Sequence, residues 1–144
     1  MTVFADSSAV VKLYADEPGA ELVRGVDLLV VSALSLVEVP AALWRKSRTG
    51  ELSVADAAVL SNAFAHEWGS ARFVPVAVGR ELLRDAAGFV ARHGLRAYDG
   101  VQLACAMAAR KADTGIDTVA CFDRELTEAA VREGFRSLAG QCST

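Results

Sequence analysis

Short apolar, β-branched runs alternate along the chain with longer stretches rich in Ala, Leu, Glu and Arg. The short runs have the length and composition of strands, and the longer stretches have those of helices. The predicted strands are residues 3–5, 28–32, 73–78, 118–122 and 135–138. Because strands that alternate with helical connections pair in parallel, the pattern predicts a layered α/β fold.

The helical stretches carry their own start and stop signals. Residues 53–68 have apolar side chains at helical spacing, with Ser53 as the predicted N-cap and Asp56 three positions on. A second such stretch covers residues 99–112, and helical sequence also follows the first strand over residues 9–15. Glu17-Pro18-Gly19 interrupts that sequence, so a separate helix running to about Gly25 is expected.

One proline indicates which position a strand takes in the sheet. Pro75 lies inside the predicted third strand. Because proline cannot donate a hydrogen bond to a neighbouring strand, this strand is predicted to lie at an edge.

Composition favours one compact domain over residues 1–144. Hydrophobic residues make up 53% of the 144, and no linker or repeat divides them. No apolar run approaches the roughly 20 residues of a membrane span. Asp6 interrupts the apolar start of the chain, so no signal peptide is expected. Three scattered cysteines (Cys105, Cys121, Cys142) indicate reduced thiols in a cytoplasmic protein.

The charge pattern leaves nucleic-acid binding open. A formal net charge of −3 argues mildly against binding to phosphates. The basic residues nevertheless cluster, in one group of Arg45, Lys46 and Arg48 and another of Arg80, Arg84, Arg92 and Arg96. Each cluster is consistent either with a solvated helix face or with phosphate contacts.

Three aspartates occupy positions where strands end or helices begin. Asp6 and Asp123 directly follow predicted strands, and Asp99 begins the 99–112 helix. The carboxyl ends of parallel strands form the edge where functional groups gather in such folds. When each aspartate is considered alone, capping or stabilisation of a helix N-terminus is the better explanation.

Glu38 is the acidic residue least easily explained by local structure. Its neighbours are apolar, and on a helix it shares a face with Leu34, Ala41 and Ala42, which we expect to face the core. A capping box from Ser35 to Glu38 is the structural alternative. A buried carboxylate is costly unless it is paired or binds a metal, so we favour a functional role.

Four carboxylates at one sheet edge would repel each other unless a cation bound between them. Oxygen ligands without nearby His or Cys favour Mg²⁺ or Mn²⁺. These ions activate water and neutralise charge on a phosphodiester, so the set Asp6, Glu38, Asp99 and Asp123 predicts phosphodiester hydrolysis.

Four segments of the chain resemble the PIN-domain family, and within it the VapC-like toxins of bacterial toxin–antitoxin pairs. The segments are Phe4-Ala5-Asp6-Ser7-Ser8 with the later Glu-Pro-Gly, Val37-Glu38-Val39, Arg96-Ala97-Tyr98-Asp99 with Gly100 to Ala104, and Phe122-Asp123-Arg124-Glu125-Leu126. They stand in the family's order, and the resemblance extends from Val3 to about Leu138.

The resemblance implies a three-layer α/β/α sandwich around a five-stranded parallel sheet, with the first and fourth strands adjacent and the third at an edge. It further implies an endoribonuclease that uses Mg²⁺ or Mn²⁺ held by Asp6, Glu38, Asp99 and Asp123. An RNA substrate, a small antitoxin and a homodimer belong to the same expectation. Ser7 or Ser8 would supply an auxiliary hydroxyl, and Arg96 is a candidate phosphate contact.

The sequence departs from the family pattern at one place. Two residues before the fourth acidic position the family often has Thr or Ser, whereas this chain has Cys121. A thiol is a weak hydrogen-bond donor, which weakens the expected polar contact there.

Two other classes of function stay open at this point. A phosphoryl-transfer domain of the phosphatase or receiver type would use Asp6. Phosphatases of this type have a second Asp two residues later, where this chain has Ser8, and receivers have a Lys after the last strand, which is absent here. The other alternative is a PIN-like module that binds RNA or protein without catalysis.

Overall fold

The computed structural model describes residues 1–142 and has a five-stranded parallel sheet in the order β3-β2-β1-β4-β5. The strands are β1 (Thr2–Ala5), β2 (Leu28–Ser32), β3 (Phe73–Val76), β4 (Thr118–Ala120) and β5 (Arg136–Ser137). The predicted parallel α/β fold is confirmed, as are the edge position of β3 and the adjacency of β1 and β4.

Three strands are shorter than predicted at one or both ends, because their chains turn away from the sheet. Asp6 donates its backbone N–H to the carbonyl of Ala120, which is the last bond between β1 and β4. Beyond it, the N–H of Phe122 bonds to the hydroxyl of Ser8 instead of to a strand. β4 therefore ends at Ala120, β3 ends at Val76, and β5 is reduced to Arg136–Ser137.

Seven helices connect the strands, and a 3₁₀ turn (Ala139–Cys142) ends the described chain. They are α1 (Ser7–Val11), α2 (Ala20–Arg24), α3 (Ser35–Arg48), α4 (Val54–Trp68), α5 (Arg80–His93), α6 (Ala97–Ala112) and α7 (Arg124–Arg132). The side chain of Ser53 accepts the N–H of Asp56, as predicted. α1 begins and ends earlier than expected, because Asp6 caps its first turn.

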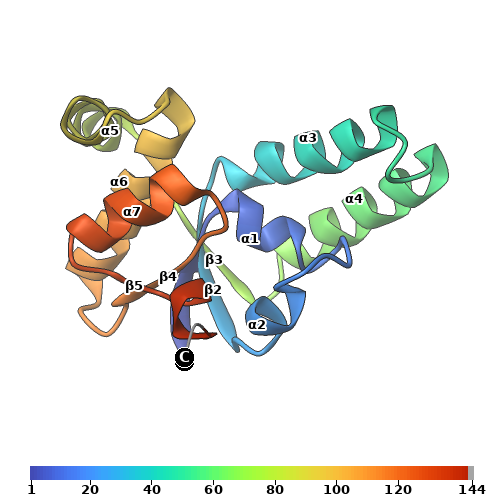
Figure 1. Ribbon diagram of the computed structural model, residues 1–144, viewed down its shortest axis with the longest axis horizontal. Helices are drawn as coiled ribbons and strands as arrows, with labels where there is room; N and C mark the ends of the chain where they lie inside the picture. Colours follow the sequence, from blue (N-terminus) through green and yellow to red (C-terminus); the bar gives the residue numbers. More distant parts are fainter. Residues whose placement is uncertain (143–144) are drawn as a thin grey trace.

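The sheet lies between two helical layers, with α1 to α4 on one face and α5 to α7 on the other (Figure 1). Alternate residues of each strand face opposite layers. Val3 and Leu29 pack under α1 to α4, whereas Phe4 and Val30 pack under α5 to α7. This is the three-layer sandwich that the family resemblance implied.

The Glu-Pro-Gly element ties the loop after α1 to the end of β4. The carboxylate of Glu17 pairs with both Lys12 and Lys46. Gly19 has φ +93°, and a Cβ at this position would lie 2.6 Å from the ring of Phe122. Lys12 Nζ also stands 4.5 Å from the centre of that ring. The element therefore holds Phe122, the residue that precedes Asp123.

Two sequence-based expectations concern the environment of the chain. Within residues 1–142, no helix is long and apolar enough to cross a membrane. Cys105 and Cys121 are buried and free. The side chain of Cys142 lies outside the part that the structure describes.

Candidate active site

All four predicted carboxylates lie in the first turn of a helix, or cap it, beyond the carboxyl ends of the strands. Asp6 is the N-cap of α1 and Asp123 is the N-cap of α7. Asp99 and Glu38 lie in the first turns of α6 and α3. All four line one open cleft of about 550 Å³. The fold thus brings together acids that are up to 117 positions apart in the sequence.

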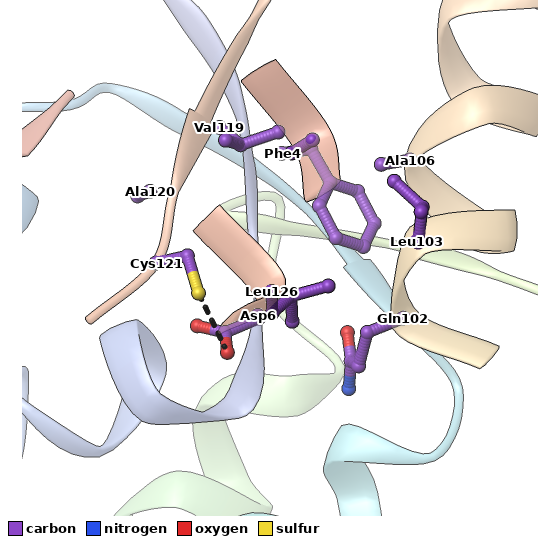
Figure 2. Close-up of a pocket in the computed structure, with 10 residues that line it drawn as sticks. Phe4, Asp6, Gln102, Leu103, Ala106, Val119, Ala120, Cys121 and Leu126 are labelled. Atoms are coloured by element: carbon purple, nitrogen blue, oxygen red, sulfur yellow. Dashed lines mark hydrogen bonds between the residues drawn. The ribbon is translucent and has the colours of Figure 1, made fainter. Parts of the chain in front are cut away.

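Asp6 is the most buried of the four, with 5% of its surface exposed. Its Oδ1 accepts bonds from the hydroxyl of Ser8 (2.7 Å) and the N–H of Ala9 (3.1 Å). The thiol of Cys121 donates to its Oδ2 over 3.3 Å (Figure 2). Burial raises the pKa of Asp6 to about 6, and these donors oppose the rise.

Ser7 and Ser8 each serve a different carboxylate, so the choice between them that the sequence left open does not arise. Ser8 donates to Asp6 and accepts the N–H of Phe122, which joins the ends of β1 and β4. Ser7 instead donates to Glu38 Oε1 over 3.0 Å.

The expectation that Glu38 faces the core is wrong. The buried stripe of α3 consists of Ser35, Val39 and Leu43, while Glu38 is half-buried and lines the cleft. The capping box that was the structural alternative for Glu38 is absent. Leu34 is the N-cap of α3 and makes no side-chain cap bond, and Ser35 Oγ lies 2.9 Å from Ser7 Oγ. α3 therefore starts one residue earlier than a cap at Ser35 requires.

Gln102 was not singled out from the sequence, although it takes part in the site. It is 2% exposed, and its Nε2 lies 2.7 Å from Glu38 Oε1 and 3.0 Å from Ser7 Oγ. A polar residue in the otherwise apolar run 101–106, three positions after Asp99, was the available signal. In Figure 2 its side chain reaches from α6 toward the space beside Asp6.

Asp99 is the one of the four carboxylates with a buried oxygen that lacks a hydrogen-bond donor within the described residues. Its Oδ2 is buried and accepts no hydrogen bond from the residues that the structure describes. Burial raises the pKa of Asp99, the negative charges of Asp123 and Glu38 raise it further, and Arg96 opposes them. An acidic oxygen that is desolvated, crowded by like charge and without a donor is suited to bind a cation.

Arg96 stands between two of the acids. Its Nε lies 3.7 Å from Asp99 Oδ2, and one terminal nitrogen lies 3.6 Å from Asp123 Oδ2. Asp123 Oδ1 accepts the N–H of Leu126, and its Oδ2 pairs with this arginine.

The donor set fits a hard divalent cation such as Mg²⁺ or Mn²⁺. It consists of oxygens, and one of them is orphaned. Among residues 1–142, no three acidic, His or Cys side chains already converge closely enough to hold a metal. The carboxylates would therefore have to close around the ion. Arg45 lines the same cleft and Arg96 lies beside Asp99 and Asp123, and arginines are suited to bind a polyanion.

Comparisons with solved structures show the same fold. VapC20 from Mycobacterium tuberculosis, described as a toxin that cleaves the sarcin–ricin loop, aligns with a TM-score of 0.63 at 18% identity, over 88% of this chain and 94% of that chain. PAE2754 from Pyrobaculum aerophilum aligns with a TM-score of 0.65 at 20% identity, over 98% and 86%. FitAcB from Neisseria gonorrhoeae gives 0.56 at 18%, over 94% and 95%.

Comparisons of sequence identify the family. No curated protein matches the chain significantly. The family model of the PIN domain matches residues 3–132, which include all four carboxylates and nearly the whole chain. The chain belongs to the PIN domain family.

Proposed function

We propose that the chain is a Mg²⁺- or Mn²⁺-dependent endoribonuclease and acts as the toxin of a toxin–antitoxin pair. The observation that carries the proposal is Asp99 Oδ2, a buried oxygen without a donor, in a cleft that three further carboxylates line. PIN domains are generally nucleases, which supports the same chemistry.

In this proposal the four carboxylates share one role, and the residues around them have others. Asp6, Glu38, Asp99 and Asp123 would hold the metal, directly or through water. Bound Mg²⁺ or Mn²⁺ would supply an activated water and charge neutralisation at the phosphodiester. Ser8 and Cys121 orient Asp6, while Ser7 and Gln102 orient Glu38. Arg96 would contact the phosphate.

Cleavage of a labelled RNA tests the nuclease directly. We expect cleavage with Mn²⁺ or Mg²⁺, loss of cleavage with EDTA, and recovery when metal is added back. Asp99→Asn should abolish cleavage because it neutralises the orphaned oxygen. Asp56→Asn is the matched control, since Asp56 also lies in the first turn of a helix but is exposed on α4. Full cleavage in EDTA or in the Asp99→Asn protein would refute the proposal.

The toxin role rests on the likeness of the fold to VapC20, which is described as a toxin. In this role the chain would act in the cytoplasm, associate as a homodimer and be neutralised by a small antitoxin. Induced expression in a bacterial host should stop growth, and Asp99→Asn should restore it. Normal growth with abundant, active wild-type protein would contradict the toxin role and leave the nuclease intact.

The phosphoryl-transfer alternative is disfavoured by the surroundings of Asp6. A phosphate acceptor needs an accessible carboxylate, whereas Asp6 is 5% exposed and both its oxygens accept hydrogen bonds. A binding module without catalysis is the remaining alternative. It predicts that RNA binds without metal-dependent cleavage.

A further inference from the structure

Arg96 connects the N-termini of two helices through their acidic residues. It is the N-cap residue of α6, and Asp99 lies three positions further along the same helix. Asp123 is the N-cap of α7. The guanidinium reaches Oδ2 of both aspartates, at 3.7 Å and 3.6 Å.

Helix stability does not explain an arginine at this position. The N-terminus of a helix carries partial positive charge, so a cation there is unfavourable. Arg96 also makes no side-chain cap bond, whereas the residues preferred at N-caps do. The two carboxylates are therefore what keep the guanidinium in place.

The contacts of Arg96 are of a kind that exchanges easily. Its side chain is 78% exposed, and both nitrogen–oxygen distances exceed those of a hydrogen bond. Exposed ion pairs of this kind contribute little to stability. A divalent ion that binds the same two oxygens would therefore displace Arg96 at a small cost in free energy.

We propose that Arg96 is a counter-cation, that is, a positive group of the protein that takes the place of the metal ion. It occupies the space between Asp99 and Asp123 in the metal-free protein. When a divalent ion binds there, Arg96 is released toward the RNA phosphate. The inference rests on the proposed function, because the ion and the RNA are those of the proposed nuclease. It adds that metal and arginine compete for the same two oxygens. Arg96 would thus neutralise Asp99 and Asp123 in the metal-free protein and contact the RNA phosphate once the metal ion has bound.

Mn²⁺ binding followed by electron paramagnetic resonance tests the competition without any turnover. Arg96→Met removes the charge but keeps a long side chain. We expect it to bind Mn²⁺ about three- to fivefold more tightly than the wild type, which is the upper part of the range for an exposed ion pair. The melting temperature of the metal-free variant should change little, because an exposed ion pair contributes little to stability. Mn²⁺ should raise its melting temperature by more than that of the wild type.

Arg124→Met is the matched control. Arg124 follows Asp123 directly but is 90% exposed and pairs with Glu128 at 3.0 Å. The substitution Arg124→Met removes the same charge close to the site but leaves Arg96 between the two aspartates. Its Mn²⁺ affinity should stay within about twofold of the wild type, as expected for a screened surface charge. An equal gain in both variants would reduce the effect to net charge and overturn the inference.

A second measurement separates the inference from the proposed function. At saturating Mn²⁺, Arg96→Met should cleave RNA about tenfold more slowly, because the phosphate loses a charged contact. If wild type and Arg96→Met bind Mn²⁺ equally and both cleave RNA, the counter-cation is refuted and the nuclease stands. If neither binds Mn²⁺ and EDTA leaves RNA cleavage unchanged, the proposed function fails, and the inference fails with it.

Discussion

Gln102 Nε2 donates a 2.7 Å hydrogen bond to Glu38 Oε1, and the same oxygen accepts the hydroxyl of Ser7. The amide comes from α6 and the hydroxyl from α1, on opposite faces of the sheet, and they meet on α3. Glu38 is therefore held by donors from two other helices at the place where it lines the cleft.

Replacing Gln102 should impair the site more than the fold. Gln102→Leu keeps the volume but removes one of the two donors to Glu38 Oε1, so the carboxylate is less well oriented. We expect RNA cleavage to fall about 10- to 100-fold, which corresponds to a lost bond to a charged group. The apparent affinity for Mn²⁺ should weaken as well, which a purely structural role would not cause. Met107→Leu on the same helix is the control, and equal losses in both variants would contradict the assignment.

Asp6 should make the metal-free protein less stable as the pH rises. Its pKa is about 6 in the folded chain, above the ordinary value of 3.8. The folded state therefore holds this proton more tightly than the unfolded state does. The stabilisation is complete below about pH 4 and is lost as the pH rises through about 6, with an upper bound of about 3 kcal/mol for a shift of this size.

Asp6→Asn provides the measurement, because the amide keeps an acceptor for Ala9 but cannot ionise. In EDTA at pH 8, denaturant unfolding should show the variant to be more stable than the wild type, and the difference should vanish near pH 4. Mg²⁺ should raise the stability of the wild type only. A wild type whose stability follows the same pH dependence as the variant would contradict the prediction.

Cys121 should set the pH at which the site loses its charge. Cys121→Ser places a stronger donor beside Asp6 Oδ2 and favours the ionised carboxylate. The acidic limb of the pH profile for Mn²⁺ binding and RNA cleavage should therefore move to lower pH. Cys105→Ser is the control, since Cys105 is equally buried but makes no bond to Asp6. An unmoved acidic limb would show that the thiol does not influence Asp6.

Gly19 should be needed for stability. Gly19→Ala places a Cβ against Phe122 in a backbone conformation with φ +93°. We expect a loss of about 1–3 kcal/mol in the free energy of unfolding, measured with a denaturant. Gly50→Ala is the control, because Gly50 also has positive φ but has nothing within 4 Å of an added Cβ. Gly50→Ala should lower the free energy of unfolding by less than Gly19→Ala does. Equal losses in the two variants would mean that the contact with Phe122 contributes nothing.

Most of the fold was predictable because it depends on local patterns. The period of the strands, the cap at Ser53 and the proline of β3 each depend on a few neighbouring residues. The strand ends were predicted less well, since the end of β4 is decided by Ser8, 114 positions away from Phe122.

The candidate site was predictable only in part, for the same reason. The order of the acidic motifs identified the four carboxylates, but their partners come from distant segments. Glu38 lies on a helix face that looks apolar in sequence, and its hydrogen-bond donors, Ser7 and Gln102, come from other helices. No periodicity reveals a bond between α6 and α3.

Two of the acids also cap helices, and this has a genetic consequence. Asn caps a helix about as well as Asp, so a change from Asp6 or Asp123 to Asn removes the charge and retains the cap. The codons of Asp and Asn differ by a single base. A single-base change therefore gives a protein that lacks the charge at either position but still folds. If the protein harms the cell, such a mutation would abolish the harm without producing a misfolded product.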